Sequence, residues 1–501
     1  MSDSTTSAAS AGSAESASFP VTRRAFGLAI IALSGMQLMA VLDGTVVNLA
    51  LAPLQAELQL SDAGRNWVVS SYVLAFGGLM LLGGRLGDSF GRRRMFLFGV
   101  ALFTVASALC GLAQNEAMLV GARIVQGAGA AVASPTAFAL VATTFAPGPV
   151  RNQAIAIYAA MTGVGSFSGL IIGGALTEVS WRWIFLINVP IGIVIIVLGT
   201  MALTETSSER TALDVPGAIL ATLGSTGVVF GIVEGPERGW TDPITLGSIA
   251  LGLALLAAFL LVERRARNPL LPFALFRDRD RVATFVAIFF SGGALFAMTV
   301  IVAVFVQDVL DYSPLRAGVS FIPFGGGMAL AAISSSWLAP RLAPRWIIAT
   351  GALLTVGYLI LASRIPADAS YWKDLFLPIG GIGFGVGLAV IALPLCAIAN
   401  VDSDHIGPLT AISLVAQNLG GPLGLAIVSA IAAAKTVSLG GITGSAVYMT
   451  PEQVVTLGEG YTFGLLACAV LAAIAAIAAL FIRYSAADVA QAKQAQHAVH
   501  H

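Results

Sequence analysis

The sequence predicts an all-helical protein that crosses a membrane many times. Of its 501 residues, 57% are hydrophobic and only 10% are charged, whereas a soluble domain carries about 25% charged residues. The hydrophobic residues form continuous runs of the length, about 20 residues, that a helix needs to cross a bilayer. Strands of a membrane barrel would appear instead as alternating segments of about ten residues. We therefore expect a polytopic all-α membrane protein.

Fourteen runs meet this criterion, so the sequence predicts 14 transmembrane helices. Their ends are defined to within about three residues. The runs cover residues 25–52, 64–84, 94–113, 117–142, 153–177, 183–203, 214–233, 245–262, 282–306, 316–338, 345–362, 374–399, 408–433 and 460–482.

The basic residues predict how these helices are oriented. Eighteen of the 26 lysines and arginines fall on the side of the two termini, and seven fall on the other side. Because cytoplasmic loops carry the excess of positive charge, both termini are expected in the cytoplasm. Arginine outnumbers lysine 23 to 3, a bias typical of GC-rich bacterial genomes, so we expect a multi-pass protein of the bacterial inner membrane.

The composition also argues against several classes of function. The formal net charge is zero, so no excess of basic residues is available to bind a nucleic-acid backbone. The three cysteines lie apart in apolar runs, and three of the four histidines lie in the last residues of the chain, so no metal motif is present. A phosphate-binding loop with its lysine is also absent, since the first lysine is Lys373. We expect no cofactor, no metal and no ATP hydrolysis.

The most charged connection, residues 263–281, divides the chain and suggests a 6+2+6 arrangement of helices. Two bundles of six helices that face each other are typical of carriers that work by alternating access. Apolar residues in this connection are compatible either with a segment lying on the inner leaflet or with a solvated linker. The expected parts are a disordered cytoplasmic N-terminus (1–24), an N-terminal six-helix bundle (25–203), a two-helix insertion with its linker (204–281), a C-terminal six-helix bundle (282–482) and a cytoplasmic tail (483–501).

Two ionisable residues lie deep inside predicted spans. Asp43 is ten residues from the outer end of the first span, about 15 Å, and Arg123 is eight residues from the outer end of the fourth, about 12 Å. Charges at such depth are costly unless they are paired, so we expect these two to form a pair. Its acid would be a proton site, since protonation releases the arginine. The alternative is a permanent ion pair with a packing role.

A glycine- and arginine-rich loop connects the second and third spans on the cytoplasmic side. Gly84 and Gly91 permit tight turns, while Asp88 can cap a helix N-terminus or pair with Arg92. Glycines, an aspartate and arginines at this spacing form a specific signature. Here the sequence resembles the major facilitator superfamily, and the resemblance assigns this loop a role as a cytoplasmic gate.

Further segments resemble the fourteen-helix drug:proton antiporter branch of that superfamily. They are Leu42-Asp43-Gly44-Thr45-Val46-Val47-Asn48 and the glycines Gly165, Gly169, Gly173 and Gly174, while Arg123-Ile124-Val125-Gln126-Gly127 resembles the span-four motif of the superfamily as a whole. Glycines four residues apart let helices approach closely. In this branch a proline usually follows the second of these glycines, where this chain has Leu170, so the bend that proline would impose is in doubt. The resemblance implies the major facilitator fold and efflux driven by a proton gradient, with Asp43 and Arg123 in proton coupling.

In a carrier of this plan, facing helices of the two bundles line a central cavity. Candidate lining residues are Met36, Met39, Tyr72, Phe76, Gln126, Met161, Phe296 and Phe324. Flexible thioethers and aromatic rings suit large, varied, apolar ligands, although each side chain could equally pack against a neighbouring helix. The predicted partners are amphiphilic small molecules or lipids, protons and membrane lipids, with the protein as a monomer.

Three alternatives differ from a drug exporter. The first is an exporter of phospholipids or glycolipids for which drug efflux is a side activity. The second is a membrane-embedded lipid-modifying enzyme, which the absence of a visible buried cluster of nucleophile, base and acid disfavours. The third is a channel or sensor, which the two-bundle layout disfavours.

Overall fold

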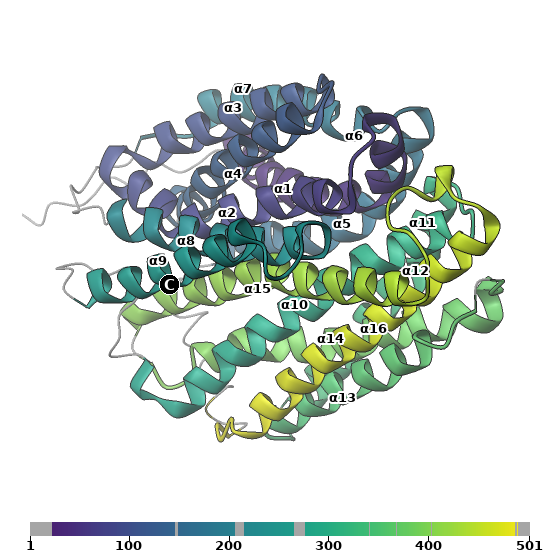
Figure 1. Cartoon of the computed structure of the whole chain (residues 1–501). Helices are drawn as coiled ribbons and strands as arrows, with labels where there is room; N and C mark the ends of the chain where they lie inside the picture. Colours follow the sequence, from purple (N-terminus) through teal and green to yellow (C-terminus); the bar gives the residue numbers. More distant parts are fainter. Residues whose placement is uncertain are drawn as a thin grey trace, which may run out of the picture.

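The protein forms a bundle of long helices that run roughly side by side (Figure 1). This computed structural model describes residues 23–145, 149–205, 215–264, 276–339, 341–366, 368–401, 403–485 and 488. Every regular element in these residues is helical. Most of the predicted disordered N-terminus and tail, and the centre of the 263–281 connection, lie outside the described residues.

The N-terminal part of the chain contains seven helices. They are α1 (Arg23–Leu58), α2 (Asp62–Phe90), α3 (Arg92–Gly111), α4 (Glu116–Thr144), α5 (Pro149–Val179), α6 (Trp183–Leu186) and α7 (Asn188–Ala202). Two helices follow, α8 (Val215–Arg238) and α9 (Pro243–Glu263). The remaining long helices are α10 (Arg279–Asp308), α11 (Pro314–Ser320), α12 (Ile322–Leu338), α13 (Pro344–Ala362), α14 (Phe376–Ala397), α15 (Ser403–Ser438) and α16 (Pro451–Leu480), with short turns η2 (Tyr371–Leu375) and η3 (Ala446–Tyr448).

Each of the 14 predicted spans overlaps one or two of these helices. Eleven spans among the described residues are long and apolar enough to cross a membrane, or twelve if the two bent parts of α2 are one span. In α5 and α8 only shorter apolar stretches were found among those residues. The all-α membrane fold is confirmed, and the count of 14 stays a prediction.

Two predicted spans are broken into two helices. The span expected at 183–203 is interrupted between α6 and α7, and the span expected at 316–338 is interrupted between α11 and α12, although each pair together is long and apolar enough to count as one span. Pro190 and Pro323 lie in the first turns of α7 and α12. Proline has no N–H to continue a preceding helix but is tolerated in the first turn, which explains both breaks.

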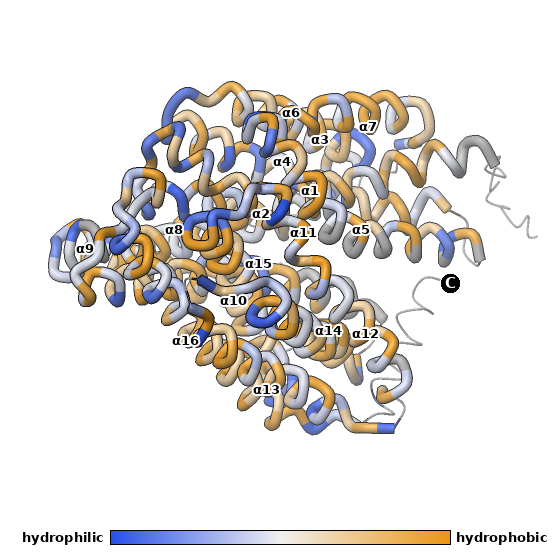
Figure 2. The backbone as a smooth tube through the Cα atoms, turned by 90° about the vertical axis from the view of Figure 1, so that its right-hand side faces the viewer, coloured by the Kyte–Doolittle hydropathy of each residue, from blue (hydrophilic) through white to orange (hydrophobic). Residues whose placement is uncertain are grey.

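The helices pack in two groups. Helices α1 to α7 pack mainly on one another and form the N-terminal bundle, and α10 to α16 form the C-terminal bundle. The pair α8 and α9 lies beside them, because α8 packs against α2 and α15 whereas α9 packs on α8 (Figure 2). The bundles meet where α1 contacts α10, α2 contacts α15 and α5 contacts α11.

Candidate functional site

The centre of the N-terminal bundle holds a buried ion pair. Asp43 of α1 and Arg123 of α4 have exposed fractions of 0% and 1%, and Arg123 Nη1 donates to Asp43 Oδ2. The structure therefore brings together the two residues that their equal depth predicted to meet. Because water is excluded from both groups, each charge is stabilised only by what the protein supplies.

Asp43 accepts two further hydrogen bonds, both at its other carboxylate oxygen. Gln126 Nε2 donates to Asp43 Oδ1 at 2.8 Å, and Asn188 Nδ2 of α7 donates to the same oxygen at 3.0 Å. Both amides also donate to Ser107 Oγ of α3, at 3.1 Å. The carboxylate thus has three donors from two helices around it.

Arg123 has contacts that do not depend on Asp43. Its Nε donates to the backbone oxygen of Val68 on α2 at 3.0 Å, and its Nη1 donates to Gln126 Oε1 at 2.8 Å. Its guanidinium lies 4.3 Å from the centre of the Tyr72 ring, a cation–π contact. These groups can hold the arginine when the carboxylate beside it is neutral.

Three members of this network were not expected from the sequence in that role. Ser107 and Asn188 were not candidates, although a single amide or hydroxyl inside an apolar run is a signal of a buried polar contact. Gln126 was expected to line a cavity, but its side chain is fully buried between Asp43 and Ser107. Its position one helical turn after Arg123 explains this, because residues three apart share a helix face.

Two carboxylates hold the turn between α2 and α3, which the sequence predicts on the cytoplasmic side. Arg92 Nε and Nη2 both donate to Asp88 Oδ1, at 2.9 and 2.8 Å. Gly91 has a φ of +98°, a conformation that glycine adopts without strain. The cap of α3 is Glu205, which follows α7 and accepts from the N–H groups of Arg93 and Arg94. Asp88 therefore pairs with arginine, and the expectation that it caps a helix is not met. Gly84 lies within α2.

The predicted antiporter glycines form a contact between α5 and α1. A Cβ built on Gly165, Gly169 or Gly173 would lie within 3.1 Å of α1 atoms, among them Val41, Thr45 and Val46. Gly174 faces α11 of the other bundle, since its Cβ would lie 2.7 Å from Pro314 O. The first three glycines therefore let the side chains of Val41 and Thr45 and the backbone at Val46 pack directly against the backbone of α5, on both sides of Asp43 in the sequence.

The remaining cavity candidates lie in or against packed cores. Met36, Met39 and Tyr72 are buried in one apolar cluster with α3 and α4, against which Phe76 packs. Phe296 packs against that cluster and also against the largest cluster, which α1, α10 and α16 share; Phe324 packs against the latter, and Met161 is partly buried. Their role in ligand binding stays a prediction.

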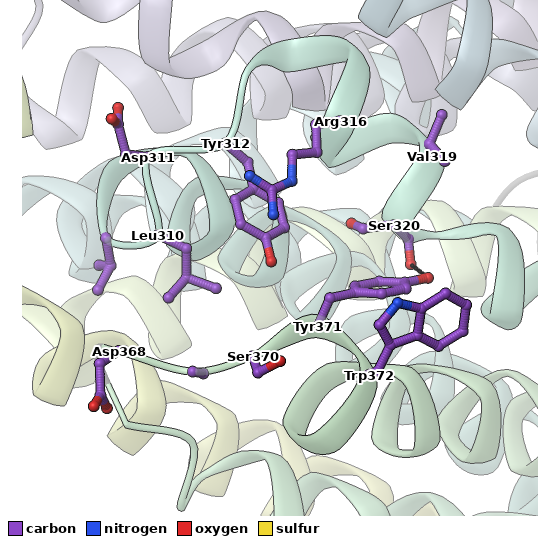
Figure 3. Close-up of a pocket in the computed structure, with 12 residues that line it drawn as sticks. Leu310, Asp311, Tyr312, Arg316, Val319, Ser320, Asp368, Ser370, Tyr371 and Trp372 are labelled. Carbon is purple, nitrogen blue, oxygen red and sulfur yellow. Dashed lines mark hydrogen bonds between the residues drawn. The ribbon is translucent and has the colours of Figure 1, made fainter.

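Two cavities lie elsewhere, towards the predicted outer ends of the helices. The larger, about 630 Å³, is lined by residues that follow α10, by α11 and by η2. In Figure 3 the guanidinium of Arg316 lies over the Tyr312 ring, and Tyr371 donates to Ser320 O. With the exposed Trp372 beside them, these aromatic residues have the composition of a membrane-interface belt. The second cavity, about 380 Å³, lies between α2, α8 and the C-terminal bundle.

Comparison with known proteins identifies the family. Residues 33–425 match the Major Facilitator Superfamily. The chain belongs to this superfamily. It is similar to the "Uncharacterized MFS-type transporter EfpA" of Mycobacterium tuberculosis, with 53% identity over 444 residues that cover 88% of this chain and 84% of that protein. This superfamily member is thus a transporter, not an enzyme.

Other relatives are resistance proteins. The puromycin resistance protein pur8 of Streptomyces alboniger is 37% identical and covers 90% of this chain and 91% of its own length. The multidrug resistance protein Stp of Mycobacterium tuberculosis is 32% identical, covering 81% and 76% respectively. Among solved structures, a bacterial homolog of the human lysosomal transporter Spinster, inward-facing and unoccupied, superimposes with a TM-score of 0.66 at 16% identity, over 92% of this chain and 98% of that one. That likeness supports the fold alone.

Proposed function

We propose that this superfamily member is a proton-coupled exporter of amphiphilic drugs or lipid-like molecules across the bacterial inner membrane. The observation that carries the proposal is the buried network of Asp43, Arg123, Gln126 and Asn188. An ionisable side chain in the membrane interior is costly and is usually functional, and reversible protonation of Asp43 would give it a function. Export of drugs is supported by relatives that are named as resistance proteins.

The geometry supports a reversible protonation of Asp43. A proton added at Oδ2 removes the charge that attracts Arg123, while Val68 O, Gln126 Oε1 and the Tyr72 ring still hold the guanidinium. The arginine then remains partly compensated instead of becoming an isolated buried cation. Asp43 is therefore the proton carrier of the proposed cycle, and Arg123 is the residue that senses its charge.

The central experiment uses proteoliposomes with an imposed pH gradient. Purified wild type and Asp43→Asn are compared for movement of a cationic dye and of a fluorescent phospholipid. Asparagine keeps the size and a carbonyl acceptor but cannot carry the proton, so gradient-driven movement should fall at least about 100-fold. The matched control is Glu57→Gln, which removes a carboxylate paired with Arg182 at the outer surface and should transport like wild type.

The two substrates separate drug export from lipid export. Movement of the dye in wild type, lost in Asp43→Asn, supports a drug:proton antiporter. Movement of the phospholipid alone, lost in the same variant, supports a lipid exporter. If wild type moves a substrate and Asp43→Asn moves it equally well under the gradient, proton coupling through Asp43 is contradicted.

A further inference from the structure

A second buried charge cluster joins the two bundles. It lies beside Gln55 of α1, which is 12 residues after Asp43, or about 18 Å along the helix at 1.5 Å per residue. Arg65, near the start of α2, lies 3.7 Å from Asp308 at the end of α10, and their side chains are 4% and 6% exposed. Tyr461 of α16 completes the cluster: Arg65 Nη1 donates to its hydroxyl, and that hydroxyl donates to Asp308 Oδ2, each at 3.2 Å. One arginine of the N-terminal bundle thus holds two side chains of the C-terminal bundle.

The N-terminal bundle fixes the position of Arg65. Its Nη1 also donates to Gln55 Oε1 of α1 at 2.9 Å, and its Nη2 lies 3.4 Å from Asp62. Gln55 in turn donates to Asp62 Oδ1 at 2.9 Å. Arg65 is therefore tied to α1 on one side and to α10 and α16 on the other, so the bundles cannot separate at this end without breaking its contacts.

Other contacts close the same end of the molecule. Tyr448 donates to the backbone oxygen of Ala56, and the N–H of Leu315 donates to Glu178, each at 3.2 Å. Both of these contacts involve side chains that lie in exposed settings, whereas the Arg65 cluster is buried. Breaking a buried ion pair leaves an uncompensated charge, so the Arg65 cluster carries the largest energetic barrier among these contacts.

The two charge clusters share helix α2. Arg123 donates to the backbone oxygen of Val68 and lies over the ring of Tyr72, and Arg65 is one turn before Val68 on the same helix. When Asp43 is protonated, Arg123 keeps its contacts with Val68 O and the Tyr72 ring but loses the attraction of the carboxylate, and this change acts on the turn of α2 that leads to Arg65. No loop or flexible side chain intervenes between the two arginines, only that turn of helix.

We propose that Arg65, Asp308 and Tyr461 form an outer latch between the bundles, with Arg65 as a positioning residue that couples the charge state of Asp43 to opening at this end. The proposal rests on the proposed function for its purpose, because coupling of proton binding to opening is what an antiporter needs. Whether these contacts hold the outer ends of the bundles together can be tested without measuring transport.

The test measures the distance between the outer ends of the bundles in full-length protein in lipid nanodiscs, at one pH and without substrate. Spin labels are attached through Gln114→Cys and Lys373→Cys, both exposed, while the three native cysteines are buried. Asp308→Asn should raise the ratio of open to closed molecules by about tenfold or more, as expected when a buried charge pair is removed. Arg182→Gln, which removes an ion pair inside the N-terminal bundle at the same end, should change this ratio less than about threefold.

Coupling to Asp43 is tested by a double-mutant cycle. If the clusters are coupled, the effect of Asp308→Asn on the open-to-closed ratio should differ by more than about threefold between the wild-type and Asp43→Asn backgrounds, since independent sites are additive within about twofold. Additive effects would overturn the coupling, and an unchanged ratio in Asp308→Asn would overturn the latch.

Tyr461→Phe is a second, milder variant that tests the latch if Asp308→Asn does not fold. It removes only the hydroxyl that bridges Arg65 and Asp308, and it should shift the ratio in the same direction by a smaller factor. A thermal unfolding midpoint close to wild type, together with an unchanged ratio, would also overturn the latch. None of these measurements needs a pH gradient. A negative result for the latch therefore leaves proton-driven export untouched, and a negative result for proton-driven export leaves the latch untouched.

Discussion

The two bundles differ in where they bury charged side chains. The N-terminal bundle buries Asp43 and Arg123 in the middle of its helices and surrounds them with amides and a hydroxyl. In the described part of the C-terminal bundle, buried charged side chains occur at helix ends, where Arg281 begins α10 and Asp308 ends it. The stretch of α10 that precedes Asp308 is apolar, with Val300 to Val306 all buried in a shared core. The comparison teaches that one bundle holds a buried charge pair between its helices while the other supplies an apolar partner surface.

The largest expected effect comes from removing the arginine of the N-terminal pair. Arg123→Leu leaves Asp43 buried without its counter-charge, which should lower the free energy of unfolding by about 3–5 kcal/mol. Thermal unfolding in detergent measures the change. Recovery of most of this loss in the double variant Asp43→Asn/Arg123→Leu would show that the unpaired charge causes it. Equal stability of wild type and Arg123→Leu would show that the N-terminal bundle does not depend on its buried ion pair.

The glycine contact that positions Asp43 should give the next effect. In Gly173→Ala the new Cβ would lie 2.8 Å from Val46 Cα, so α1 and α5 must separate, at a cost of about 1–3 kcal/mol. Gly121→Ala is the matched control, because nothing lies within 4 Å of that Cβ. The control should be neutral or slightly stabilising. The thermal unfolding midpoints of the two variants test this, and similar midpoints would contradict a packing role for Gly173.

A smaller effect is expected where the N-terminal bundle uses charge at its surface. Glu205→Gln weakens the cap of α3, whose N–H groups at Arg93 and Arg94 bind the carboxylate. Charge at a helix N-terminus is worth about 0.3–1 kcal/mol, and salt should reduce the difference. Thermal unfolding at low and high salt tests this. A loss of stability as large as that of Arg123→Leu would show that burial of a charge does not determine the size of the effect.

The smallest effect should occur at a buried polar group of the C-terminal bundle. Thr355 on α13 bonds only its own helix, through Gly351 O at 2.9 Å, in the contacts that the structure describes. Thr355→Val keeps the shape, so stability should change by less than about 1 kcal/mol. Dye movement in proteoliposomes should depend on the pH gradient as in wild type. A loss of this dependence would show that proton handling extends into the C-terminal bundle.

The sequence predicted the fold because the bilayer imposes long apolar helices. It predicted the contact of Asp43 with Arg123 because two charges at equal depth have few other partners. It missed Asn188 and Ser107, since many polar residues occur in apolar runs and only the packing of α3 and α7 shows which ones meet. It also missed Glu205 as the cap of α3, because more than 100 residues separate them in the sequence.

The contact of α1 with α5 implies that the hydrogen-bond geometry around Asp43 is adjustable from a distance. Gly165, Gly169 and Gly173 leave room for Val41, Thr45 and Val46, so at these three positions the segment of α1 that bears the acid rests directly on the backbone of α5. A shift of that support by a few tenths of an ångström changes the lengths of three hydrogen bonds to one carboxylate. Small residues that make no hydrogen bond to Asp43 thereby determine how closely its hydrogen-bond donors approach it.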